Sequence, residues 1–481
     1  MIPIRSRVRV FKALCLLTSV VCIPLAGRCL WPRPKNKSGA PPAVYSLREH
    51  PVAIPRTPRG AELAGLARTP WPKAYHDLQN RSRSPLPGPR QPTMGWSAFV
   101  GDYRGSGVGP PAVGENGVVC RGADSERVNG FTGGGTVESR TTAGKLSWSL
   151  GIGSVIGSSP AFAGDGVVYV NSDDGFLYAI DPGGRIRWRV RLWEKERAKL
   201  KFVGVPGVWD VSPSISRRGV VFTPTTALRG NAGTEGSTGE DSRLYAVSPN
   251  GKVLWRMDLP GQAIDRCPAV ASDGSLYLTT SRWLYALDEH GTVRWRRAVG
   301  DWSSQPLITD DGSVVICDSG RVLKLFTSGK LIWRRPIGGA RDLALGWHGD
   351  IYVGCDALID KARLGKQESI AGWHGDIYIA GAPGGICSLT AGGRIRWWVC
   401  QHRSISGVPV VDRDGNLYVG LSDGFGHEWL SSLTKNGVVR WRYKFHGDIT
   451  GSAIGAPGQL YVTARNHHIY SLGDRRPESR H

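Results

Sequence analysis

The stretch that decides the fold is residues 159–188, SPAFAGDGVVYVNSDDGFLYAIDPGGRIRW. Runs rich in β-branched and aromatic residues are separated by Asp-Gly and Pro-Gly-Gly turns, where glycine accepts the positive φ that a tight hairpin needs. The last run alternates polar and apolar residues, as a half-buried strand does, and ends in Trp188. The unit therefore predicts a four-stranded antiparallel meander of about 40 residues, the size of a propeller blade.

The tryptophan that ends this unit recurs along the chain, at Trp96, Trp148, Trp188, Trp255, Trp295, Trp333, Trp397 and Trp441. Residues 451–472 repeat the inner strands without a closing tryptophan strand, whereas the segment around Trp96 is a closing strand without inner strands. Joining the two completes one composite blade, so we expect an all-β, eight-bladed propeller closed by its N- and C-terminal strands. Seven or nine blades stay possible, because GWHGDIY occurs twice, at residues 346–352 and 372–378.

The composition agrees with a repeat array. The 481 residues include 65 glycines and 18 tryptophans, and no long stretch has helical periodicity. Inserts interrupt the repeat at residues 129–135, 193–210, 230–241 and 346–378. Loops on a rigid scaffold commonly carry function, so we expect partners to bind at these inserts.

The N-terminal part of the chain has a different character. Basic residues precede an apolar run at residues 13–23, which predicts a signal peptide or membrane anchor over residues 1–27. Residues 28–70 are expected to be a disordered Pro/Arg-rich linker, residues 71–474 the propeller and residues 475–481 a disordered tail. Whether Cys29 is lipidated and whether the signal is cleaved stay open.

The net charge of +21 is unevenly distributed, because residues 1–96 contain 16 Lys and Arg against 3 Asp and Glu. Such a basic arm can attract phosphates or anionic headgroups, although a solvated linker explains it more simply.

The start of the repeat region resembles the PQQ-like, or quinoprotein-like, β-propeller repeat family. Trp71-Pro72, the loop from Asn80 to Pro85 and the strand ending in Trp96 are similar to the segments that open those domains. The resemblance covers residues 71–473. It implies either a quinoprotein alcohol dehydrogenase, which holds pyrroloquinoline quinone (PQQ) and Ca²⁺ in its central channel and uses an Asp base, or a BamB-like scaffold without a cofactor.

The motifs favour the BamB-like branch. Ala179, Asp181, Gly184, Arg185 and Trp188 resemble the tryptophan docking motif of the dehydrogenases, but this copy is one residue shorter and lacks the Thr. Such a motif fastens neighbouring blades together rather than performing catalysis. The adjacent Cys-Cys pair of those enzymes is absent from the sequence, and no Glu/Asn/Asp calcium set can be assembled from it.

Other candidate sites have simpler explanations. Residues 310–312 (Asp-Asp-Gly) and 412–416 (Asp-Arg-Asp-Gly-Asn) lie where the repeat has a hairpin turn, so we interpret them as turns rather than calcium loops. His467-His468 and the two Trp-His-Gly sites could bind a metal, but surface histidines are more common. The nine cysteines lack a zinc-binding spacing, and disulfides among the six in the repeats stay open.

The sequence thus predicts an exported, non-enzymatic scaffold, periplasmic, secreted or membrane-tethered, and monomeric. We expect a protein or envelope-polymer partner on the ring faces and blade inserts, and no nucleic acid, cofactor, catalytic residue or metal site. One alternative is a PQQ/Ca-dependent oxidoreductase. Another is a carbohydrate-binding propeller, which would expose Trp193, Trp209, Trp347 or Trp373 on one face.

Overall fold

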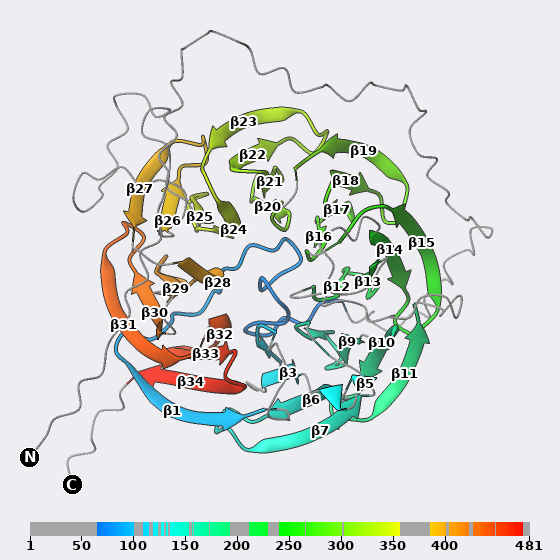
Figure 1. The fold of residues 1–481 in the computed structure, drawn as a ribbon, viewed down its shortest axis with the longest axis horizontal. Coiled ribbons are helices and arrows are strands. Elements are labelled where there is room, and N and C mark those ends of the chain that lie inside the picture. Colours follow the sequence, from blue (N-terminus) through cyan, green and yellow to red (C-terminus); the bar gives the residue numbers. More distant parts are fainter. Residues whose placement is uncertain are drawn as a thin grey trace, which may run out of the picture. The chain divides into compact units, whose positions relative to one another are not determined.

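Each repeat forms one antiparallel sheet, and the sheets are arranged radially like the blades of a propeller (Figure 1). The computed structural model describes residues 65–474 except 101–108, 115–118, 124–126, 129–130, 133–134, 153–155, 157, 173, 193–210, 229–239, 265, 301–302, 356–384, 401–403, 423–426 and 448. All described residues belong to one compact unit, Val44–His481. They contain strands and turns but no helix, and so no helix among them could span a membrane.

Seven blades are each built from one continuous part of the chain. Blade 1 contains β2 (Ala112–Val113), β3 (Val119–Ala123), β6 (Gly135–Arg140) and β7 (Leu146–Ile152), with a small added hairpin of β4 (Arg127–Val128) and β5 (Phe131–Thr132). Blade 2 contains β8 (Ala161–Phe162), β9 (Val168–Ser172), β10 (Phe176–Ile180) and β11 (Ile186–Arg191). Blade 3 contains β12 (Ser214–Ile215), β13 (Val221–Leu228), β14 (Glu240–Val247) and β15 (Val253–Pro260).

The next four blades follow the same order from the axis outward. Blade 4 contains β16 (Ala269–Val270), β17 (Leu276–Thr279), β18 (Trp283–Leu287) and β19 (Val293–Ala298). Blade 5 contains β20 (Leu307–Ile308), β21 (Val314–Cys317), β22 (Arg321–Leu325) and β23 (Leu331–Pro336). Blade 6 contains β24 (Ala340–Leu345), β25 (Ile351–Cys355), β26 (Gly385–Leu389) and β27 (Ile395–Cys400). Blade 7 contains β28 (Ser404–Val411), β29 (Leu417–Ser422), β30 (His427–Leu433) and β31 (Val439–His446).

The remaining sheet, here called the closing blade, joins the two ends of the described chain. It contains β32 (Ile449–Ala456), β33 (Gln459–Ala464) and β34 (His468–Asp474), with β1 (Pro92–Phe99) as its outermost strand. Trp96 of β1 pairs with Ser471 of β34. The composite blade expected from the sequence is therefore confirmed. The ring thus has seven blades that are each formed by one continuous part of the chain. The eighth blade of the prediction corresponds to the closing blade, which combines β1 with three C-terminal strands.

The register within a blade explains the repeated aromatic pattern. In blade 4, Tyr277, Ala286 and Trp295 lie directly opposite one another on three neighbouring strands. Because the middle residue is small, the two aromatic rings meet over it, with centroids 6.0 Å apart. Blade 2 repeats this arrangement with Tyr169, Ala179 and Trp188. Cross-strand aromatic pairs of this kind stabilise a sheet.

The closing tryptophans also fasten each blade to the next. In all eight, the indole Nε1 donates a hydrogen bond to a carbonyl oxygen of the following blade or of the segment before β1: Thr142 from Trp96, Pro182 from Trp148, Pro249 from Trp188, Glu289 from Trp255, Thr327 from Trp295, Ala391 from Trp333, Lys435 from Trp397 and Pro89 from Trp441. The docking role inferred for Trp188 is thereby confirmed and extends around the ring.

Several sequence predictions concern residues outside the described part of the chain. These are the signal or anchor at residues 1–27, most of the linker, the tail at residues 475–481, Cys29, and the second Trp-His-Gly copy at residues 372–378. The described contacts begin at Gly65, six residues before the predicted start of the propeller.

Candidate functional site

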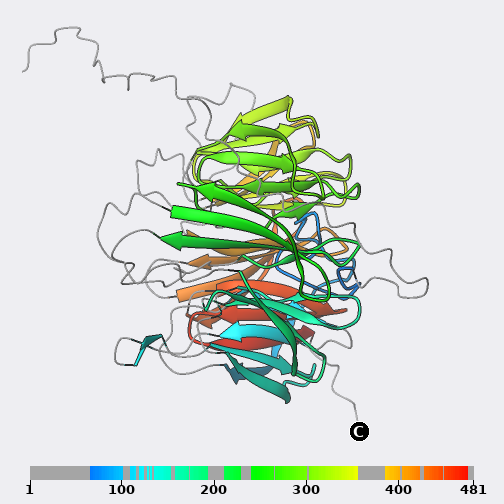
Figure 2. The same cartoon turned by 90° about the vertical axis from the view of Figure 1, so that its right-hand side faces the viewer.

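Residues 65–91, here called the axial segment, cross the ring at the ends of its innermost strands (blue in Figures 1 and 2). The segment makes backbone hydrogen bonds first to blades 2 and 1, then to blades 4, 5, 6 and 7, and last to the closing blade. The pairs are Ala67 to Phe162, Trp71 to Val113, Leu78 to Val270, Gln79 to Ile308, Arg81 to Leu345, Ser82 to Val411 and Pro87 to Gly458. Backbone groups of the inner strand ends would otherwise need water. The axial segment therefore covers one end of the ring axis with the protein's own chain.

A buried lysine organises this segment. Lys73 is fully buried, and its Nζ donates to the carbonyl oxygens of Ala74 at 2.7 Å and Asp77 at 3.3 Å and to Oδ1 of Asn80 at 2.8 Å. Burial lowers the pKa of Lys73. Nevertheless, three acceptors need three N–H groups, which only the ammonium form has. Lys73 thus acts as an internal cation around which the chain turns.

Asn80 connects this turn to the blades. Its Nδ2 donates to the carbonyl oxygens of Cys267 at 3.1 Å, before β16, and of Pro306 at 3.0 Å, before β20. Its backbone φ is +56°, and Tyr75, His76 and Ser82 also have positive φ. Non-glycine residues adopt this conformation only where their surroundings hold them in it. The side-chain bonds of Lys73 and Asn80 provide such a hold.

Two arginines of the axial segment converge on one aspartate of blade 5. Asp310 Oδ1 lies 3.0 Å from Arg81 and 2.5 Å from Arg83. Burial alone would raise the pKa of Asp310, but the two guanidinium groups outweigh it and lower that pKa. The turn interpretation of residues 310–312 is correct, because Gly312 N–H bonds to Thr309 O. The structure adds that this turn supplies a counter-ion to the axial segment.

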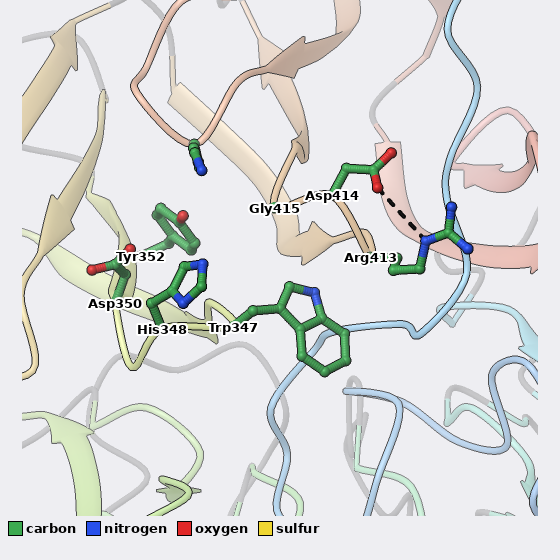
Figure 3. Close-up of a pocket in the computed structure, with 8 residues that line it drawn as sticks. Trp347, His348, Asp350, Tyr352, Arg413, Asp414 and Gly415 are labelled. Carbon is green, nitrogen blue, oxygen red and sulfur yellow. Dashed lines mark ion pairs between the residues drawn. The ribbon is translucent and has the colours of Figure 1, made fainter.

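A shallow pocket lies beside this cluster, between the inner hairpins of blades 6 and 7 (Figure 3). Its empty volume is about 270 Å³ and includes open solvent. The lining residues are Trp347, His348, Asp350, Tyr352, Arg413, Asp414, Gly415 and Lys435.

Trp347 forms one wall of this pocket and is held from two sides. The Arg83 guanidinium lies 4.5 Å from its ring centre, and its Nε1 donates to Asp412 O at 2.7 Å. The side chain is still 38% exposed. Asp350 is buried and bonded to Arg396 at 2.6 Å, so its charge is already paired. The groups that face the pocket could bind a small polar or sugar-like molecule.

Trp347 is the only tryptophan of the four suggested for carbohydrate binding that falls within the described residues, and it is exposed as that hypothesis requires. Trp193, Trp209 and Trp373 lie outside the described part.

The turn interpretation of residues 412–416 is correct. Asp412 Oδ1 accepts hydrogen bonds from the backbone N–H groups of Asp414 and Asn416, as in an Asp-led turn. His467 lies in the turn before β34, and His468 is the first residue of that strand, where it packs against Phe99 and Tyr470. Within the described ranges, no three His, Cys, Asp or Glu side chains come together as a metal site would need.

Four of the repeat cysteines, Cys267, Cys317, Cys355 and Cys387, are buried as thiols. Burial raises the pKa of Cys317 far above its usual value. The side chains of Cys120 and Cys400 lie outside the described part. The described cysteines therefore behave as small core residues.

Sequence reasoning did not identify Lys73, Arg83 or the contact with Trp347. The available signal was Lys73 in the stretch WPKAYHDLQN (residues 71–80), seven residues before Asn80. Without the ring, nothing indicated that both would be buried.

The family model for the outer membrane protein assembly factor BamB matches residues 133–208 and 240–366. No curated protein sequence matches at a significant level.

Solved structures resemble the chain in fold. BamB from Moraxella catarrhalis is 17% identical, with a TM-score of 0.53 over 81% of this chain and 99% of that one. A europium-containing methanol dehydrogenase is 14% identical, with a TM-score of 0.60 over 85% and 98%. The Dos1 propeller is 10% identical, with a TM-score of 0.54 over 80% and 96%. At these identities the likeness concerns the fold alone.

The family match, the eight docking tryptophans and the composite closing blade agree with the resemblance noted in the sequence. The chain is thus similar to the PQQ-like β-propeller repeat family in its repeats and in its fold.

Proposed function

We propose that this protein is a non-enzymatic, BamB-like scaffold that is exported and binds a protein partner on one face of its ring. The axial segment is the observation that carries the proposal. It hydrogen-bonds to the inner strands of six sheets and to the inner hairpin of the closing blade, all at one end of the axis. A ring braced in this way is a rigid platform, and its free face is the one opposite the axial segment.

The irregular connections support the choice of that opposite face. In an antiparallel blade, the link from the second to the third strand and the link to the next blade start from the same end. The axial segment bonds at the other end, beside the inner hairpins. β25 ends at Cys355 and β26 begins at Gly385, while β11 ends at Arg191 and β12 begins at Ser214. The longest connections therefore leave and return at the face that the axial segment does not cover.

The apolar run at residues 13–23 supports action outside the cytoplasm, by a secreted, periplasmic or membrane-tethered protein. The match to the BamB family model supports a role with protein partners.

Site-specific photo-crosslinking in the native host tests the proposal. A crosslinking amino acid at Arg282, in the turn before β18, or at Arg321, the first residue of β22, should give discrete adducts with the same protein, because both are exposed on the connection face. The matched positions are Arg217 and Arg413, exposed on inner hairpins beside the axial segment, and these should give none. Adducts from the second pair alone, or none from either pair, would contradict the proposal.

The first alternative is a PQQ/Ca-dependent oxidoreductase, favoured by the likeness to methanol dehydrogenase. The donors in the described ranges do not fit it well. Ca²⁺ requires several oxygen ligands, but carboxylates do not cluster there, and the oxygens around Lys73 already surround an ammonium group. Adding PQQ and Ca²⁺ to purified protein tests this alternative: bound quinone absorbance with dye-linked alcohol oxidation would replace the scaffold proposal.

The second alternative is carbohydrate binding at Trp347, favoured by its exposure in the pocket. A neutral glycan that changes tryptophan fluorescence in the wild type but not in Trp347→Ala would support it. No difference between the two proteins would end it.

A further inference from the structure

The outermost strands carry a marked excess of positive charge. The outer strands of blades 2 to 7, namely β11, β15, β19, β23, β27 and β31, contain thirteen Lys and Arg but one acidic residue, Asp258. The other two outer strands, β1 and β7, contain no charged residue. The basic side chains therefore form a cationic band along six successive blades and leave a gap where the ring is closed.

Within the band, the charges are aligned in columns. Arg187, Arg189 and Arg191 alternate along β11, and all three are exposed. Arg442 and Lys444 alternate along β31 in the same way and are exposed. Alternate residues of a strand lie on one face about 7 Å apart. Each column thus presents regularly spaced cations to solvent.

Aromatic rings on the neighbouring strand of the same blade make cation–π contacts with residues of these columns. The guanidinium groups of Arg189 and Arg191 each lie 4.9 Å from the ring centre of Phe176. Arg296 lies 4.4 Å from Trp283, and Lys444 lies 5.8 Å from Trp429. These contacts restrict long side chains before any ligand arrives, which lowers the entropy lost on binding.

Some members of the band have intramolecular partners, such as Arg187, whose guanidinium lies 2.8 Å from Asp165. Both side chains of this pair are more than 40% exposed. Exposed ion pairs contribute little and exchange readily for another anion. Arg396 is an exception, because its partner Asp350 is buried. The other twelve cations still exceed the one acidic residue of the band, and this excess can bind a polyanion.

We propose that this cationic band binds a flexible, linear anionic polysaccharide. A flat membrane or a compact protein could touch only one side of a ring, whereas a flexible chain can follow six blades. Duplex DNA is too stiff to follow so small a ring without a large bending cost. Single-stranded nucleic acid would need aromatic faces for base stacking, and Phe176, Trp283 and Trp429 already have a cation over the ring.

This site is separate from the connection face of the proposed scaffold function. Loss of polysaccharide binding would leave the crosslinking result intact, and a negative crosslinking result would leave this proposal intact.

The test measures binding of heparin fragments and polygalacturonate to the full-length protein by titration at several salt concentrations, with neutral dextran for comparison. One variant removes the β11 column, Arg187→Gln/Arg189→Gln/Arg191→Gln, and a second removes two charges of β31, Arg442→Gln/Lys444→Gln. The matched control, Arg217→Gln/Arg218→Gln, removes two exposed charges from an inner hairpin. Melting temperatures verify that each variant folds. The two column variants test the same proposal independently, because they remove charges from different strands.

We expect each column variant to weaken heparin binding about tenfold or more and to lower the salt slope by about one per lost contact, while the control changes binding less than about threefold. Affinity should also rise with fragment length as more columns are engaged. Unchanged binding in both column variants, equal losses in the control, or tighter binding of a single-stranded oligonucleotide of matched charge would each overturn the proposal.

Discussion

The indole Nε1 of Trp441 donates a hydrogen bond to the carbonyl oxygen of Pro89, 3.1 Å away and 352 residues distant in sequence. In the other seven junctions the acceptor lies in the hairpin between the third and fourth strands of the next blade. The closing blade has no such hairpin, because its fourth strand is β1. The axial segment supplies the missing carbonyl, so the same residues that cover the axis also complete the ring.

Trp441→Phe should loosen the axial segment. The variant keeps the aromatic contact but loses one hydrogen bond, so we expect a stability loss of about 1 kcal/mol and faster tryptic cleavage at Arg81 and Arg90. Trp295→Phe loses the corresponding bond to Thr327 and serves as the matched control, with similar stability loss but normal cleavage. Equal cleavage of both variants would contradict a special role for Pro89.

Gly329→Ala should be more harmful than Gly312→Ala. The two glycines have φ of +81° and +80°, so alanine has the same backbone strain at each, about 1 kcal/mol. A Cβ at residue 329 would lie 2.8 Å from the Trp295 ring, whereas residue 312 has no atom within 4 Å of that position. Because the backbone strain is the same in both variants, the difference between their melting temperatures measures the cost of disturbing the contact with Trp295. Equal melting temperatures would show that the ring can move away.

Lys73→Met should strongly destabilise the ring. The substitution leaves the carbonyl of Ala74 and Oδ1 of Asn80 buried without their donor. Each unsatisfied group costs about 1–3 kcal/mol, so we expect a loss of at least about 3 kcal/mol in urea unfolding. Lys252→Met, at an exposed turn position, should change stability by less than about 0.5 kcal/mol. A small effect at Lys73 would mean that the axial segment is not held by this ammonium group.

A double-mutant cycle should detect the contact of Arg83 with Trp347. Their separation of 4.5 Å predicts a coupling free energy of about 0.5–1 kcal/mol between Arg83→Met and Trp347→Ala in urea unfolding. Arg81→Met in place of Arg83→Met is the control, because Arg81 binds the same Asp310. Similar coupling in both cycles would assign the effect to Asp310 rather than to the indole ring.

Acid should release the axial segment. Burial would raise the pKa of Asp77, but the His76 ring 3.8 Å away and the Arg81 guanidinium 2.6 Å away lower that pKa well below its usual value of 3.8. The pKa of Asp310 is lowered by Arg83 and Arg81. A carboxyl with a depressed folded pKa contributes stability above its unfolded pKa and loses it as pH falls toward the folded value. The urea midpoint should therefore drop between pH 5 and pH 3.

Asp77→Asn tests the origin of that drop. The variant should be less stable at pH 5 and should lose less on going to pH 3, because it has one carboxylate fewer to protonate. A drop as large in Asp77→Asn as in the wild type would place its cause elsewhere.

The repeat could be predicted from sequence because its signals are local. Asp-Gly and Gly-Gly turns, β-branched strands and the tryptophan after each third hairpin depend on neighbouring residues, and their period gave the blades and the composite closing blade. The turn interpretation of Asp310 and Asp412 also came from adjacent residues. The basic columns of β11 and β31 are visible in the sequence as alternating arginines, but only the sheet order places them on the outer edge.

The sequence alone thus determined the all-β blades, their docking tryptophans and the meeting of the two chain ends. Only the tertiary structure decided that residues 65–91 cover the axis, that Lys73 is buried, and that Arg83 lies between Asp310 and Trp347. The physical reason is distance along the chain: Arg83 meets Asp310 across 227 residues, and no local pattern encodes that contact. It exists because the closed ring brings the ends of all its inner strands to one axis, where a single extended segment can reach them.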